Sequence, residues 1–185
     1  MAERMPESAL AIGSPLPQFK RLKGVNGRMY SWEDFKSTKI VVVVFSCNHC
    51  PYVQAYEERM VAFQRAYAQK GVQLVAINAN ETSAYPQDTY EEMVKRAMTR
   101  GFNFPYLRDE TQRVARAYGA EYTPEAFLLN SRFQVRYIGR IDDNWQHPDK
   151  VKTHDLRNAI DAVLAHRRVE NPVTHAIGCT IKWKY

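Results

Sequence analysis

Two cysteines separated by two residues, Cys47 and Cys50, are the residues of this chain best suited to chemistry. They follow the apolar run Ile40–Phe45, which is short, β-branched and without alternation, as in a strand buried on both faces of a parallel sheet. From Pro51 to about residue 70 the pattern is helical. This turn predicts that the first sulfur lies at a helix N-terminus, where free N–H groups and the helix dipole favour a thiolate. A thiolate is the nucleophile of disulfide exchange.

The spacing of the pair suits reversible disulfide formation. The two sulfurs can be joined with little backbone movement, so Cys47 can attack a substrate disulfide and Cys50 can resolve the mixed disulfide. The alternative is half of a zinc site, but zinc usually needs a second cysteine pair. Since Cys179 is the only other cysteine, such a site would also need His175. The strand before the pair and the helix after it favour redox chemistry, with no metal and no cofactor.

His49, directly before the second cysteine, is suited to tune the pair. An imidazole at this position can stabilise the Cys47 thiolate, which favours the dithiol and makes the disulfide more oxidising. The alternative for His49 is a surface residue of the turn. Pro51 fits the first turn of a helix, where its missing N–H costs nothing.

Length and composition indicate an ordinary globular protein. The 185 residues, 45% apolar and 25% charged, predict one domain over residues 1–185, with residues 1–12 flexible and residues 167–185 forming a tail. No stretch approaches the ~20 apolar residues that span a bilayer, so no membrane partner is expected. The first 13 residues carry Glu3 and Glu7 and lack the apolar core of a signal peptide. We therefore expect a cytoplasmic location, where structural disulfides are disfavoured.

The net charge of +6 raises the question of a nucleic-acid partner. The basic residues are dispersed along the chain and form no dense run interleaved with aromatic residues. The charge therefore indicates a solvated surface and no nucleic-acid partner, with a mild preference for acidic partners left open.

Periodicity and turn residues predict an alternation of strands and helices. An Asn-Gly pair within residues 24–30 predicts a hairpin, followed by a short helical turn that Ser31 caps. Further along the chain we expect, in order, a helix over 51–70, a strand over 72–77, a helix from 88 or 89 to 100, a short strand over 104–107, a helix over 111–118, strands over 125–129 and 133–139, and a helix over 153–166.

The segment after residue 166 is irregular but apolar near its end. Residues 177–183 include Ile181 and Trp183, so we expect this tail to dock on the domain. Cys179 within it has two interpretations. It is either a small buried residue or a third redox cysteine that relays electrons or pairs with Cys47.

The pair at a strand-to-helix turn, followed by Thr123-Pro124 before a strand, resembles the thioredoxin fold. In that fold a cis-proline faces the cysteines and aligns the substrate chain. The resemblance implies this role for Pro124 and implies that the Thr123 backbone pairs with substrate. Asn48, which lies between the two cysteines, is assigned to substrate binding together with Thr123 and Pro124.

Two further segments resemble the redoxin branch, which includes the alkyl hydroperoxide reductases and thiol-specific antioxidant proteins. They are the lead-in over residues 13–19 with its hairpin, and residues 45–53, which are similar to small CxxC-containing thioredoxin-family proteins. The resemblance covers essentially the whole chain. It implies an α/β, thioredoxin-like three-layer fold with a central mixed sheet, an N-terminal β extension and a docked C-terminal tail.

The chain departs from its relatives at two acidic positions. Val41 stands where thioredoxin has a buried aspartate, and Val53 stands where membrane-tethered relatives have a glutamate. The proton acceptor for Cys50 is therefore not identified. Glu57 is a candidate two helical turns further on, with an exposed surface residue as the alternative.

The resemblance implies thiol–disulfide oxidoreduction by the Cys47/Cys50 pair on protein or small-thiol substrates. The expected partners are disulfide- or dithiol-containing proteins and a thioredoxin reductase or glutathione system. One alternative is a thiol-dependent peroxidase with Cys47 as the peroxidatic residue. Against it, Val44 stands where peroxiredoxins have threonine. The other alternative is a redox-sensing or zinc-binding module without turnover.

Overall fold

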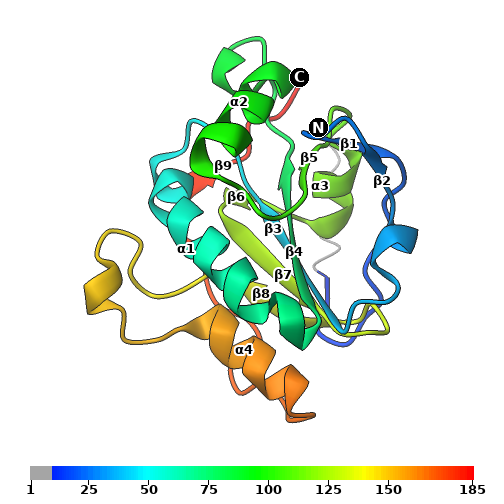
Figure 1. Cartoon of the computed structure of the whole chain (residues 1–185), viewed down its shortest axis with the longest axis vertical. Helices are drawn as coiled ribbons and strands as arrows, with labels where there is room; N and C mark the ends of the chain where they lie inside the picture. Colours follow the sequence, from blue (N-terminus) through cyan, green and yellow to red (C-terminus); the bar gives the residue numbers. More distant parts are fainter. Residues whose placement is uncertain (1–9) are drawn as a thin grey trace, which may run out of the picture.

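A central seven-stranded sheet organises the chain (Figure 1). The computed structural model describes residues 10–185, so most of the segment predicted to be flexible, residues 1–9, lies outside it. The strands lie in the order β2-β1-β5-β4-β3-β7-β8. Their bounds are β1 Leu22–Gly24, β2 Met29–Tyr30, β3 Ile40–Phe45, β4 Val72–Asn78, β5 Tyr106–Arg108, β7 Glu125–Leu129 and β8 Val135–Gly139.

The directions of the strands confirm the predicted mixed sheet. β3 runs parallel to β4, and β4 runs parallel to β5. β3 is antiparallel to β7, and β7 is antiparallel to β8. Every residue of β3 is buried, which explains why its sequence is uniformly apolar.

Helices cover both faces of the sheet. The bounds of the α-helices are α1 Pro51–Tyr67, α2 Tyr90–Arg100, α3 Arg113–Tyr118 and α4 Asp155–Leu164. Short 3₁₀ turns are η1 Trp32–Phe35, η2 Ala68–Lys70, η3 Pro86–Asp88 and η4 Pro148–Lys150. None of the helices in residues 10–185 combines the length and the apolar character that a membrane crossing requires.

Alternate residues of β3 divide the core into two parts, as the two-residue period of a strand requires. Val42 and Val44 face a cluster that contains residues of α1, α2 and α4. Val41 and Val43 face the other cluster, which contains residues of α3, η1 and the N-terminal segment. The structure therefore has three layers, with the sheet in the middle, as predicted.

The N-terminal extension adds two strands to one edge of the sheet. β1 pairs antiparallel with β2 and with β5, which confirms the predicted hairpin. Ser31 and Asp34 form the capping box of η1.

The C-terminal tail docks on the domain. Its β9, Cys179–Thr180, pairs antiparallel with β6, Tyr122–Thr123, in a separate two-stranded sheet. Val173 also bridges to Ile138 of β8, the last strand of the main sheet. Ile181 is 3% exposed within the core cluster that includes α3. The predicted docking of the tail is confirmed, whereas the β6–β9 pairing has no counterpart in the sequence-based assignment.

Candidate active site

Cys47 and Cys50 lie in the loop that joins β3 to α1. α1 begins at Pro51, and Cys50 is its N-cap residue. Both thiols are buried, with Cys47 1% exposed and Cys50 0% exposed. The sequence-based placement of the first sulfur at the helix N-terminus is therefore wrong, because it is the sulfur of Cys50 that lies there.

Thr123 faces both sulfurs from the strand that precedes β7. The Cys47 Sγ lies 3.5 Å from the Thr123 Oγ1, and the Cys50 Sγ lies 3.2 Å from the Thr123 carbonyl oxygen, to which the Cys50 thiol donates when it is protonated. The peptide bond between Thr123 and Pro124 is cis. The structure thus brings Cys47, Cys50, Thr123 and Pro124 together in one place.

The surroundings of the two sulfurs favour a thiolate at Cys50. A hydrogen bond from the Cys47 thiol lowers the pKa of Cys50, and so do the backbone N–H groups of Val53 and Cys179. The same Cys47–Cys50 contact raises the pKa of Cys47, as do its burial and the nearby Asp88 carboxylate. The contact between the two thiols therefore favours ionisation of Cys50 over ionisation of Cys47.

Asp88, at the end of η3, organises the loop that carries the cysteines. Its side chain is 0% exposed. One carboxylate oxygen accepts the Asn48 backbone N–H at 2.6 Å and the Asn78 side-chain amide at 3.2 Å. The other accepts the Asn80 side-chain amide at 2.9 Å and contacts the Nδ1 of His49. Sequence reasoning assigned Asp88 only to a helix start, so its place in the site was missed.

His49 lies against Asp88 and close to Cys47. Its ring stacks on that of Tyr85, with the centroids 5.0 Å apart. One potential metal-ligand atom from each of Cys47, His49 and Asp88 lies within 4.8 Å of the other two. An imidazole–carboxylate pair thus lies beside the thiol that has the raised pKa, where it is placed to accept a proton.

The same three residues have the donor types of a metal site, but the carboxylate fits that role poorly. All four lone-pair positions of Asp88 are already directed at Asn48, Asn78, Asn80 and His49. His175, which a zinc site with Cys179 would need, is not part of this group. The arrangement favours a hydrogen-bonded thiol site over a metal centre.

Asn48 uses both ends of its side-chain amide within the protein. Its side-chain amide donates to the Gln87 carbonyl at 2.7 Å, and its Oδ1 accepts the Tyr106 hydroxyl at 2.9 Å. The residue is buried and both polar ends of its side chain are bonded within the protein, so it holds the loop in place.

Glu57 is neither exposed nor in contact with the thiols. Its carboxylate is 2% exposed and accepts two hydrogen bonds from Arg96, with Arg100 in ion-pair range at 3.4 Å. These contacts give Glu57 a structural role and do not support it as the proton acceptor for Cys50.

Cys179 is the third sulfur of the site. Its residue pairs with Thr123 in the β6–β9 ladder, and its side chain packs against the Cys47, Cys50 and Val53 cluster. The Cys179 thiol hydrogen-bonds to Cys50. The sequence-based alternative had paired it with Cys47. β9 occupies the place beside Thr123 that was predicted for a substrate chain.

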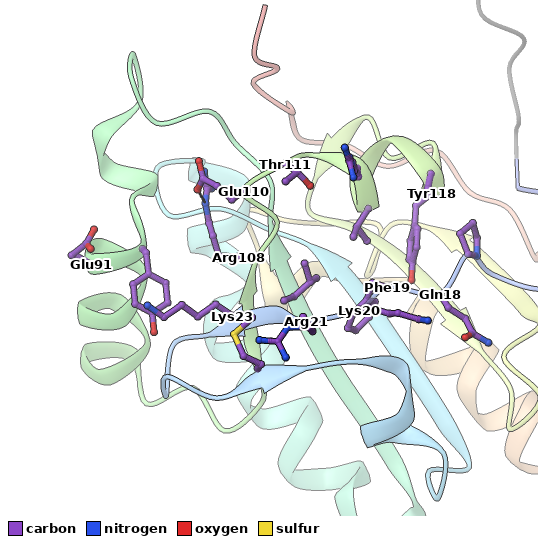
Figure 2. A pocket seen from close by; sticks show the side chains of 17 residues that line it. Gln18, Phe19, Lys20, Arg21, Lys23, Glu91, Arg108, Glu110, Thr111 and Tyr118 are labelled. Carbon is purple, nitrogen blue, oxygen red and sulfur yellow. Dashed lines mark hydrogen bonds and ion pairs between the residues drawn. The ribbon is translucent and has the colours of Figure 1, made fainter.

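The cavity shown in Figure 2 lies away from these sulfurs. Its volume is about 750 Å³, and it lies between the N-terminal extension, which supplies Lys20 and Arg21, and α3, which supplies Tyr118. No cysteine lines it. This cavity is therefore not part of the thiol site.

Comparisons with known proteins agree with the geometry. The family model described as Redoxin matches residues 11–160. Over 97 residues the chain is 30% identical to the thiol-disulfide oxidoreductase ResA of Halalkalibacterium halodurans. That match covers 52% of this chain and 51% of the ResA protein, so it spans about half the length of each.

Solved structures extend the likeness over nearly the whole chain. An uncharacterized conserved protein from Geobacillus kaustophilus is 38% identical, with a TM-score of 0.89 and 98% of each chain covered. A hypothetical protein from Sinorhizobium meliloti 1021 is 36% identical, with a TM-score of 0.87 and coverage of 96% of this chain and 97% of that one. A thiol:disulfide interchange protein DsbE from Chlorobium tepidum, 22% identical with a TM-score of 0.67, covers 84% of this chain and 99% of that one and shares the fold. With its thioredoxin-like sheet and the match over residues 11–160, the chain belongs to the redoxin family.

Proposed function

We propose that this protein is a thiol–disulfide oxidoreductase whose redox couple is Cys47 and Cys50. The observation that carries the proposal is that the two sulfurs contact each other and that both contact Thr123, which precedes the cis-proline Pro124. Family membership supports the same class of chemistry. The proposed substrates are proteins that carry a disulfide or a dithiol.

The couple would cycle between a disulfide and a dithiol that holds one thiolate. In the reduced form Cys50 carries the charge and Cys47 carries the proton. Closing the disulfide requires Cys47 to lose that proton. We assign its acceptance to the His49–Asp88 pair, which lies beside the Cys47 thiol.

The lowered pKa of Cys50 has a consequence for the direction of electron flow. Stabilising the thiolate stabilises the reduced form, which makes the disulfide more oxidising. We therefore propose a reduction potential above the ~−270 mV of thioredoxin. A thiol reductant of the thioredoxin or glutathione type would then restore the dithiol.

Peroxide reduction is the weaker proposal. It needs a thiolate at Cys47, but the pKa of that thiol is raised by its hydrogen bond to Cys50, by burial and by Asp88. Rapid loss of the Cys47 thiol at micromolar hydrogen peroxide would favour peroxidase activity over our proposal.

Redox titration with thiol counting tests the proposed couple. In buffers of reduced and oxidised glutathione, the wild-type protein should lose two thiols reversibly, and peptide mapping should place the disulfide at Cys47 and Cys50. The His49→Gln variant, which lacks the imidazole assigned to accept the Cys47 proton, should close the disulfide more slowly. Stoichiometric zinc, or no disulfide between these residues, would contradict the proposal.

A further inference from the structure

Of the three cysteines in this chain, Cys179 has solvent access and the other two do not. Cys47 and Cys50 are covered by Thr123, by the loop that Asp88 holds and by the tail. A disulfide on another molecule must contact a sulfur directly, because exchange proceeds through a mixed disulfide. In this structure the partly exposed cysteine is Cys179.

Backbone pairing fixes Cys179 at the redox couple. Cys179 lies opposite Thr123 in the β6–β9 ladder, and the Thr123 hydroxyl donates to the Cys179 carbonyl oxygen at 3.4 Å. Gly178 allows this close approach, since a Cβ there would overlap the Thr123 carbonyl oxygen. The Cys179 side chain packs on the cluster that contains Cys50.

The residues that flank Cys179 are firmly anchored. Ile181 is buried, and its N–H donates to the Glu121 carbonyl at 2.9 Å. The buried Gln112 side chain donates to the Lys182 carbonyl at 2.8 Å and accepts the Lys184 N–H at 2.8 Å. A segment held in this way keeps its cysteine at the site, as a third member of the constellation.

The same pairing blocks the usual approach of a substrate chain. A polypeptide that added as a strand beside Thr123 would need the hydrogen bonds that β9 already makes. While β9 is in place, an incoming disulfide therefore approaches over Cys179.

We propose that Cys179 is a third redox cysteine through which the Cys47/Cys50 couple exchanges electrons with disulfides of other molecules. The proposal rests on the proposed function and adds to it the route by which substrate reaches the buried couple. The substrate class is a solvent-accessible disulfide, R–S–S–R′, that docks at the outer side of β9.

The exchange balances in three steps. Cys179 attacks R–S–S–R′ to form a Cys179–S–S–R mixed disulfide, and its proton leaves with the other half as R′SH. The Cys50 thiolate then attacks the Cys179 sulfur, which forms a Cys50–Cys179 disulfide and releases RS⁻. Finally Cys47 attacks the Cys50 sulfur and gives its proton to the His49–Asp88 pair, and the released Cys179 thiolate takes up a proton in its place. The couple is oxidised by two electrons and the external disulfide is reduced to two thiols.

Protonation of the reduced site makes the first step the slow one. Burial and the hydrogen bond to Cys50 raise the pKa of Cys179 to about 11, which leaves little of it as the attacking thiolate at neutral pH. The lowered pKa of Cys50 favours a thiolate beside the sulfur that it must attack in the second step.

Trapping each intermediate tests the route directly. The full-length Cys50→Ser variant, reduced and then treated with oxidised glutathione, should accumulate glutathione on Cys179, since the resolving thiol is gone. The Cys47→Ser variant should form a Cys50–Cys179 disulfide. Peptide mapping by mass spectrometry reads both results. Glutathione on Cys47 in the first variant, or no Cys50–Cys179 disulfide in the second, would overturn the route.

Kinetics supply a second test that separates the route from the couple. The Cys179→Ser variant should react with oxidised glutathione at least about tenfold more slowly than wild type, and should still form the Cys47–Cys50 disulfide at equilibrium. Thr180→Ser, at the exposed neighbour in β9, is the matched control and should react at the wild-type rate. A Cys179→Ser rate equal to or above wild type would overturn the route and leave the couple intact. Absence of a Cys47–Cys50 disulfide in wild type would instead overturn the proposed function.

Discussion

The backbone N–H of Asn48 donates a 2.6 Å hydrogen bond to the Asp88 carboxylate, 40 residues further along the chain. This contact ties the loop that carries both cysteines to the turn before α2. Asp88 is fully buried, and hydrogen-bond donors and His49 surround its carboxylate, whose negative charge raises the pKa of the nearby Cys47 thiol.

We predict that Asp88→Asn destabilises the fold and lowers the pKa of Cys47. Asparagine has one acceptor oxygen, and its NH₂ group would face donors, so we expect a loss of ~1–3 kcal/mol for the unsatisfied groups. Removing the negative charge favours ionisation of Cys47. Urea denaturation measures the first effect, and thiolate absorbance against pH measures the second. Asp149→Asn, at an exposed acid of η4, is the control, and equal losses in both variants would refute the role of Asp88.

The thiolate at Cys50 predicts a specific pH dependence. An ordinary thiol with the reference pKa of 9.0 is only about 1% ionised at pH 7, whereas the lowered pKa of Cys50 keeps its thiolate at neutral pH and below. Ultraviolet absorbance should therefore report close to one thiolate per reduced chain at pH 7. That signal should be lost as the pH falls through the lowered pKa.

The same shift links Cys50 to stability. A folded-state pKa below the unfolded value contributes stability that is present above the unfolded pKa and is lost as the pH falls through the folded pKa. Cys50→Ser should remove both the absorbance and this pH-dependent part of the unfolding free energy. A neutral-pH thiolate signal that persists in Cys50→Ser and vanishes in Cys47→Ser would contradict the assignment.

Glu57→Gln separates a structural carboxylate from a catalytic one. The variant leaves the Arg96 guanidinium without its charged partner, and breaking a buried pair costs ~3–5 kcal/mol, with less expected here because Arg96 is partly exposed. Chemical denaturation should show the loss. The reduction potential of the couple should stay unchanged, and a shift in that potential would indicate that Glu57 does act on the thiols.

Gly178→Ala should loosen the tail over the site. The added methyl group would overlap the Thr123 carbonyl oxygen, and overpacking of this kind typically costs ~1–3 kcal/mol. Each ~1.4 kcal/mol increases the opened fraction about tenfold, so Cys47 and Cys50 should react with N-ethylmaleimide roughly tenfold faster. Thr180→Ala in the same strand is the control, and equal rates in both variants would show that the tail does not limit access.

Much of the fold follows from local patterns. The uniformly apolar run of β3 and the helical periodicity of α1 each persist over several residues, so their prediction is confirmed with similar bounds. The β6–β9 ladder has only two residues per strand, which is too short for any periodicity to appear. Its partners are also more than fifty residues apart in sequence, and only the folded chain brings them together.

The candidate site is partly readable in the same way. The spacing of Cys47 and Cys50 and the later Thr123-Pro124 pair gave its sulfur chemistry and its opposing strand. Pro51, which fits the first turn of a helix, also indicates Cys50 as the N-cap residue, because proline favours the first helical position. Asp88 carried no such signal, because a capping aspartate and a buried acid look identical in sequence.

The bridge between Val173 and Ile138 means that the segment bearing Cys179 also shields β8, the outermost strand of the main sheet. Pro172 and Thr174 make backbone hydrogen bonds to Ile138 on that strand. Removing the tail would leave the backbone N–H and C=O of Ile138 without these partners. An exposed edge strand with unpaired backbone groups can pair with another molecule and aggregate. Solubility and thiol access are therefore coupled through one segment, so single substitutions can separate the two effects and truncation cannot.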